Sequence, residues 1–126
     1  MEILKYDEGE EYYDPNKITE RVRLFYPKNF SQDKEIRIGW ETDGPGIKEN
    51  LHTHKTLEVM ILVKGEGKWF TNDREYSLKP VSVIFVPSGE PHGYENISQK
   101  ENLEFIFIYA PAGAEEDIRQ VWKRAK

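Results

Sequence analysis

The amino-acid sequence predicts an all-β protein, a sandwich or barrel built from many short strands. Segments rich in alternating, β-branched and aromatic residues recur at intervals of about eight to twelve residues. Turn residues, mostly Gly, Pro and Asn, separate these segments. A chain of 126 residues has the usual size of one domain, and no internal repeat or low-complexity linker divides it. We therefore expect residues 1–126 to form a single domain.

The first third of the chain gives two strand signals. Residues 1–20 are polar with an acidic cluster, and we expect a solvated surface segment there. A short strand is expected over residues 21–26, which a proline closes. Residues 35–40 alternate cleanly, with the two isoleucines and the tryptophan on one side and charged residues on the other. Parity alone leaves open which side faces the interior.

The middle of the chain predicts a series of strands joined by tight turns. They are expected over 52–54, 57–63, 68–71, 75–78 and 82–86, in a segment that begins at His92, and over 103–109. Residues 57–63 are mostly apolar on both faces. This pattern favours a strand that is buried on both sides, either inside a sandwich or under a subunit contact.

The C-terminal segment predicts the one helix, over about residues 114–125. Ile118, Val121 and Trp122 recur at helical spacing. Acidic residues lie at the start of this segment and basic residues at its end, as the helix dipole favours. We expect the helix to pack on the outside of the sheets.

Composition and charge argue against several classes of protein. The net charge is -5 and no basic stripe stands out, so a nucleic-acid partner is not expected. No apolar run approaches the roughly 20 residues of a membrane span, and the acidic N-terminus does not resemble a signal peptide. The absence of cysteine suits a reducing compartment and excludes thiolate metal sites. We expect a cytoplasmic protein without membrane partners.

The residues that carry chemistry gather in two short runs. The chain has three histidines, of which His52 and His54 lie two positions apart, with Glu58 following, whereas His92 lies in the second run. On a strand, side chains two positions apart project on the same face. Two imidazoles on one face, a nearby carboxylate and a third imidazole that the fold brings in complete a ligand set for a divalent metal.

These two runs resemble the sequence motifs of the cupin family. The first motif, Gly-x5-His-x-His-x(3,4)-Glu-x6-Gly, is filled by Gly46, His52, His54, Glu58 and Gly65. The end of the second motif, Pro-x-Gly-x-x-His-x-x-x-Asn, is filled by Pro87, Gly89, His92 and Asn96. One position departs from the pattern, because Val81 stands where the second motif opens with glycine.

The resemblance implies a double-stranded β-helix, a jelly-roll barrel of two antiparallel sheets with its core motifs at 46–96. It also implies a homodimer, since small single-domain cupins commonly pair. The metal that it implies in the barrel mouth is held by His52, His54, Glu58 and His92. Asn96 is expected to fix a turn. Tyr94 shares the parity of His92 and is either a phenol near the metal or a half-buried aromatic.

Three imidazoles and one carboxylate suit one divalent transition metal, which is Fe, Mn, Ni, Cu, Co or Zn. Four protein ligands leave two positions of an octahedral shell for water, substrate or dioxygen. The sequence thus favours a small metalloenzyme acting on an oxygen-rich small molecule, with a dioxygenase preferred to an isomerase or decarboxylase. A binding or sensor cupin without turnover is the alternative. Regulatory cupins often add a DNA-binding helix pair, and no such segment occurs in these residues.

Overall fold

The computed structural model describes all 126 residues, and nearly all of its regular structure is β-strand. The strands are β1 (Glu10–Asp14), β2 (Lys17–Phe25), β3 (Arg37–Asp43), β4 (Lys48–His52), β5 (Leu57–Lys64), β6 (Gly67–Phe70), β7 (Glu75–Leu78), β8 (Ser82–Val86), β9 (His92–Asn96), β10 (Leu103–Ala110) and β11 (Lys123–Arg124). One α-helix, α1 (Glu116–Val121), and two short 3-10 turns, η1 (Tyr6–Glu8) and η2 (Asp33–Glu35), complete the chain.

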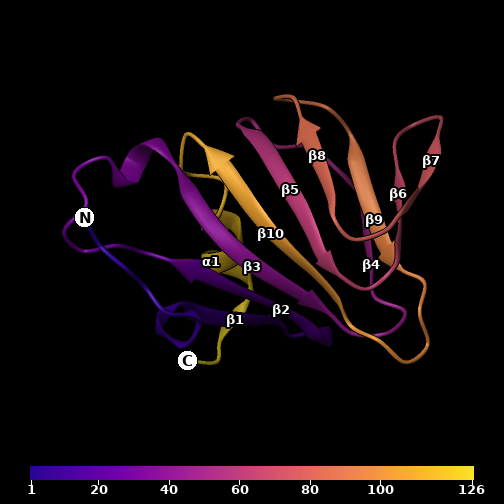
Figure 1. Cartoon of the computed structure of the whole chain (residues 1–126), viewed down its shortest axis with the longest axis horizontal. Helices are drawn as coiled ribbons and strands as arrows, with labels where there is room; N and C mark the ends of the chain where they lie inside the picture. The colour runs from indigo at the N-terminus through magenta and orange to yellow at the C-terminus, as the bar shows by residue number, and fades with distance from the viewer.

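The strands form two antiparallel sheets, as the sequence predicts. The larger sheet has seven strands in the order β11-β1-β2-β3-β10-β5-β8, and the smaller has four in the order β4-β9-β6-β7. Figure 1 shows the smaller sheet beside the β5–β8 end of the larger one. The inner faces of both sheets bury apolar side chains, each of which contributes about 1.5–3 kcal/mol when fully buried. The most deeply buried of these are Val22, Leu24, Met60, Leu62, Leu103, Phe105 and Phe107.

The prediction for the N-terminal segment is only partly right. Residues 1–8 lie at the surface as expected, but β1 and the start of β2 extend the larger sheet over residues 10–20. Tyr12 is 4% exposed and Val22 is 1% exposed, so alternate residues of these strands enter the core. The intervening positions include Glu11, Arg21 and Arg23, and Glu11 forms ion pairs with both arginines. Their high polarity hides a strand signal that depends on a few apolar residues at every second position.

Strand β3 turns its polar side inward. Arg37, Glu41 and Asp43 are buried, whereas Ile38 on the opposite parity is 40% exposed. The inward side also carries Gly39, where an added Cβ would lie 2.0 Å from the ring of Phe107. Glycine is therefore required there by the close approach of that ring. This arrangement places two carboxylates of β3 inside the protein.

The C-terminal helix is shorter than the predicted range 114–125. It spans six residues, and Trp122 already has an extended backbone with φ -86° and ψ 159°. The next residues form β11, which pairs with the free edge of β1. Glu11 closes this pairing, since its N–H donates to the carbonyl of Lys126 at 2.8 Å and its carbonyl accepts from Ala125 at 2.7 Å. Pairing of the β1 edge therefore replaces further helical turns.

No helix of the structure is long and apolar enough to cross a membrane.

A buried ion pair fixes α1 to the larger sheet. Arg37 Nε donates to Glu115 Oε2 at 3.2 Å, and both side chains are about 5% exposed or less. The same guanidinium forms a bidentate pair with Asp33, at 2.6 and 2.8 Å, and lies 4.1 Å from the ring centroid of Tyr26. Breaking a buried pair of this kind costs about 3–5 kcal/mol, because one charge is left without a partner. The start of α1 is thus held in one position.

The turn residues of the two sequence motifs have structural roles. Asn96 donates through Nδ2 to the carbonyls of Asp43, Gly44 and Glu101, at 3.1, 3.0 and 2.9 Å, which confirms that it fixes a turn. Val81 is 70% exposed. No non-glycine residue has a positive φ, so the backbone at position 81 does not require the glycine that the motif has there.

Candidate metal centre

The four residues of the predicted ligand set come from both sheets. His52 ends β4 and His92 begins β9, and these two are directly opposite one another in the antiparallel register. Glu58 projects from β5 of the larger sheet and is 3% exposed. The predicted strand 52–54 is wrong for His54, because β4 ends at His52 and residues 53–56 connect it to β5. The interior between the sheets is therefore where the four meet.

The three imidazoles converge. One ring nitrogen from each of His52, His54 and His92 lies within 4.8 Å of the others. Glu58 Oε1 is 3.1 Å from Nε2 of His92 and 3.7 Å from Nε2 of His54. The structure thus brings together His52, His54 and His92, which we call the histidine cluster, and places Glu58 against two of them. His54 reaches this cluster from a connection instead of a strand.

Backbone carbonyls orient two of the imidazoles. Nδ1 of His52 lies 2.7 Å from the carbonyl oxygen of Asn50, and Nδ1 of His92 lies 2.9 Å from that of Glu90. A carbonyl can only accept, so each Nδ1 carries the proton and donates it. Nε2 of each ring is then the atom with a free lone pair, which is the form in which histidine binds metals.

Burial and the Glu58 carboxylate have opposite effects on the pKa values of His54 and His92. Burial lowers the pKa of His54, and the charge of Glu58 offsets this only in part. Burial also acts to lower the pKa of His92, but hydrogen bonds to Glu58 and to the carbonyl of Glu90 outweigh it, so the pKa of His92 is raised. Protonation of His92 at Nε2, opposite Glu58, is therefore favoured over that of an ordinary histidine, and a metal at this nitrogen would compete with that proton.

The donor chemistry of this cluster fits a divalent transition metal. Three imidazole nitrogens and one carboxylate oxygen form a borderline N/O set. His92 is 1% exposed, and Trp69 stacks on its ring with centroids 5.4 Å apart. On the other side, Tyr109 meets the ring of His54 edge-on at 5.2 Å. Aromatic side chains thus limit how far the imidazoles can move.

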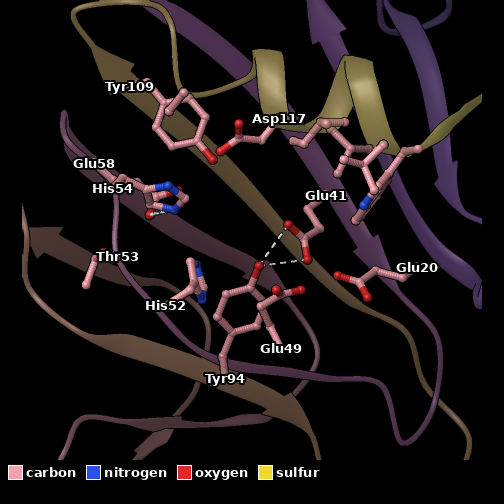
Figure 2. A pocket seen from close by; sticks show the side chains of 15 residues that line it. Glu20, Glu41, Glu49, His52, Thr53, His54, Glu58, Tyr94, Tyr109 and Asp117 are labelled. Atoms are coloured by element: carbon pink, nitrogen blue, oxygen red, sulfur yellow. Dashed lines mark hydrogen bonds and ion pairs between the residues drawn. The ribbon is translucent and has the colours of Figure 1, made fainter.

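A second polar cluster lies in the same interior and was not predicted from the sequence. Glu20 of β2, Glu41 of β3 and Glu49 of β4 each place one carboxylate oxygen within 4.8 Å of the other two. Tyr94 donates its hydroxyl to both oxygens of Glu41, at 2.9 and 2.8 Å. Figure 2 shows the three carboxylates pointing toward one another, next to the Tyr94 hydroxyl. We call Glu20, Glu41 and Glu49 the carboxylate cluster.

Burial and crowding raise the pKa values of these acids. Burial, a hydrogen bond to Glu49 and the charges of Glu41 and Glu49 raise the pKa of Glu20 to about 10. Burial is also the main reason that the pKa values of Glu41 and Asp43 lie well above their ordinary values. Asp43 is 0% exposed, and neither of its carboxylate oxygens has a hydrogen-bond partner.

The sequence contained one indication of this cluster, the alternation in residues 35–40. Parity alone did not show which side of that strand faces the interior. The three acids are separated by up to 29 positions and lie on different strands, so only the sheet pairing brings them together. Tyr94 faces the interior, as its parity with His92 predicts, and is 4% exposed. Its hydroxyl is bonded to Glu41, and its ring stacks on Trp69 with centroids 5.7 Å apart.

One cavity of about 310 Å³ joins the two clusters. The three acids of the carboxylate cluster line it together with His52, His54 and Glu58. Helix α1 covers part of it through Asp117, Ile118 and Val121, so the expectation that the helix packs on the outside of the sheets is wrong. No lysine or arginine lines the cavity.

Comparisons with known proteins agree with this fold. A family model described as a cupin domain matches residues 39–109. An RmlC-like cupin from Shewanella frigidimarina superposes with a TM-score of 0.73 at 18% identity, covering 92% of this chain and 96% of that one. KdgF from Halomonas sp. superposes with a TM-score of 0.74 at 13% identity, covering 91% and 99%. At these identities the likeness shows the fold alone.

Two curated relatives are similar in sequence over part of their length. The auxin-binding protein T92 of Nicotiana tabacum is 28% identical over 85 residues, which cover 60% of this chain and 46% of that protein. An oxalate-binding protein of Thermotoga maritima is 34% identical over 65 residues, which cover 51% of this chain and 53% of that protein. This chain therefore spans about half the length of the curated relatives that it matches.

The raised pKa of Glu20 predicts a stability that falls as pH rises. Between its ordinary value of 4.5 and about 10, the folded protein keeps a proton that the unfolded chain releases. The unfolded state then binds fewer protons, so the free energy of unfolding decreases with pH in this window. We expect Glu20→Gln to be more stable than the wild type, with a difference that grows from pH 5 to pH 9.

Thermal denaturation in chelator over that pH range measures the effect. Glu66→Gln makes the same chemical change on an exposed turn and is the matched control. Parallel pH profiles for Glu20→Gln and the wild type would contradict the raised pKa.

Proposed function

The chain belongs to the cupin family, and from this premise we propose that it is a metal-dependent cupin acting on a small molecule. The proposed ligands of one divalent transition metal are His52, His54, Glu58 and His92. The observation that supports this set is the convergence of three imidazoles, two of which lie beside the buried Glu58 carboxylate. The set suits Fe, Mn, Ni, Cu, Co or Zn, and cupins commonly bind a metal.

The protein residues orient and protect such a centre. The carbonyls of Asn50 and Glu90 hold the Nδ1 protons of His52 and His92, which keeps both Nε2 atoms available as donors. Glu58 is buried and has no basic partner other than the histidines, so its charge is directed at the cluster. When bound, the metal would supply a Lewis acid and, if it were iron, manganese or copper, redox chemistry.

The cavity is where a small molecule would bind beside this centre. Its volume of about 310 Å³ lies at the lower end of the range for small-molecule sites. His52 and His54 line it, so a ligand in the cavity would meet the histidine cluster directly. Within this class we favour a dioxygenase over an isomerase or decarboxylase, because a histidine-rich N/O set with open positions suits a redox-active metal.

A binding module without turnover is the second candidate. Two of the matched relatives are named for the ligand that they bind, auxin in one case and oxalate in the other. In this candidate the same four ligands and the same cavity hold a small molecule that leaves unchanged.

We also propose a homodimer through the outer face of the larger sheet. Two rows of apolar residues cross four strands there, because the registers of β3, β10, β5 and β8 align them. One row is Ile38, Ile108, Val59 and Phe85, and the other is Trp40, Ile106, Ile61 and Val83. Phe85 is 76% exposed on the edge strand β8. An apolar surface of this extent is typical of an interface between subunits.

Removal of two imidazoles tests the metal centre. We expect metal analysis of the protein as isolated to find about one equivalent of a divalent transition metal, and His52→Ala/His54→Ala to lose it, because only two of the four donors remain. Far-UV circular dichroism of the variant should match the wild type, since the apolar core supplies most of the stability. Lys55→Ala, at an exposed position in the same segment, is the control. A metal-free wild type under aerobic and anaerobic purification would refute the proposal.

Turnover separates the enzyme from the binding module. With Fe, Mn, Ni or Cu added, we expect dioxygen uptake on a panel of diketones and quinols for at least one metal, and none in His52→Ala/His54→Ala. The signal is followed with an oxygen electrode. If every metal is silent and a bound compound is recovered unchanged after long incubation, the binding module is the correct reading.

The dimer depends on the apolar outer face. We expect the wild type to have about twice the 14.9 kDa mass of one chain and Phe85→Asp to be monomeric, because the variant places a charge in the interface core. Light scattering after size-exclusion chromatography measures both masses. Ile18→Asp changes an apolar side chain that is 64% exposed and lies outside the two rows, and it should remain dimeric. A monomeric wild type at micromolar concentration would rule out this interface.

A further inference from the structure

The carboxylate cluster has no role in the proposed metal centre. Its three acids come from three strands in both sheets and meet at the cavity wall. Glu20 and Glu41 are 1% and 6% exposed, which is unusual for acidic residues whose one basic neighbour is Lys17, at 3.8 Å from Glu20. A buried carboxylate without a counter-ion is costly, so these acids keep protons while no cation is bound, as their raised pKa values indicate. A bound cation would displace such a proton and pair with the carboxylate that forms.

Several buried oxygens near the cavity lack a partner. Glu20 Oε1 makes no hydrogen bond, and Figure 2 shows its carboxylate directed toward Glu41 and Glu49. Both oxygens of Asp43, which shares the inward side of β3 with Glu41, also lack hydrogen bonds. Lys17 approaches Glu20 Oε1 only to 3.8 Å, donates to the carbonyl of Lys48 and does not line the cavity. Lys17 is therefore the one cation paired with the cluster, and no lysine or arginine lines the cavity itself.

We propose that the carboxylate cluster binds the positively charged nitrogen end of a small molecule, an ammonium or guanidinium group. An ammonium with three N–H···O bonds of about 2.8 Å in tetrahedral directions has its acceptors about 4.6 Å apart. One oxygen from each of the three acids lies within 4.8 Å of the others, so the three are close enough to accept from one ammonium. The Tyr94 hydroxyl already holds Glu41 in place through both oxygens, so this acceptor is oriented in advance.

The remaining walls suit an organic cation better than a hydrated metal ion. Val22 lies two positions from Glu20 on the same inward face of β2, and Ile118 and Trp122 of the C-terminal segment line the same cavity. These apolar side chains can cover a short alkyl stem. Calcium or magnesium would instead need six or more oxygen ligands, several of them water. The cation site itself does not depend on the proposed metal centre. The inference rests on the proposed function only where it places the other end of the bound molecule at the histidine cluster.

Four probes of equal length and different charge test the inference. Butylammonium, butylguanidinium, 1-butanol and butyrate are titrated into the protein as isolated, and binding is followed by two-dimensional NMR. We expect the two cations to bind at least about tenfold more tightly than the alcohol and the anion, because hydrogen bonds between charged groups are the strongest. Glu20→Gln and Glu49→Gln should each weaken cation binding by about tenfold. Glu66→Gln should not change it.

The outcomes separate this inference from the proposed metal centre. Equal binding of all four probes, no binding of either cation, or cation binding that survives Glu20→Gln and Glu49→Gln would each overturn the inference. Calcium that binds in a cluster-dependent way while neither organic cation does would also overturn it, in favour of a metal site. His52→Ala/His54→Ala should bind the cations like the wild type. A wild type without metal that still binds the cations would refute the metal proposal alone.

Discussion

The pairing of β4 with β9 is the constraint on which both polar clusters depend. In this register His52 is opposite His92, and Glu49 is opposite Tyr94, with an irregularity of β4 between the two pairs. A slip by one residue would turn these side chains to the other face of the sheet. Because the larger sheet places Glu58 and Glu41 across the interior, the histidine cluster and the carboxylate cluster form at two ends of one cavity.

The two ends of the cavity differ in chemistry but share supports. Trp69 stacks on His92 and on Tyr94, with centroids 5.4 and 5.7 Å away, so one indole positions a metal-ligand candidate and the tyrosine that holds Glu41. The histidine end offers nitrogen donors with one carboxylate, and the other end offers oxygen only. A molecule that spans the cavity would thus meet a site for a metal-bound group at one end and a site for a cation at the other. The two ends of the cavity would therefore bind two different ends of the same molecule.

Strand β3 places its apolar residues on the outer face of the larger sheet and its charged residues on the inner face. Its apolar residues Ile38 and Trp40 lie on the outer side, where β10, β5 and β8 continue the rows across the sheet. Its charged residues lie inside, where Arg37 anchors the start of α1 and Glu41 joins the carboxylate cluster. The usual rule of apolar inside and polar outside is reversed on this strand. A cavity on one side and a subunit contact on the other would account for both faces.

The sequence by itself determined the strand-rich fold, the two cupin motifs and the residues of the histidine cluster, because these depend on local alternation and fixed spacing. The structural role of Asn96 and the inward direction of Tyr94 could also be predicted, from the motif and from parity. The tertiary structure decided the rest. Glu20, Glu41 and Glu49 come together only through strand pairing, and the short α1 depends on the free edge of β1. Contacts between segments far apart in the chain leave no local pattern, so alternation and spacing carry no information about them.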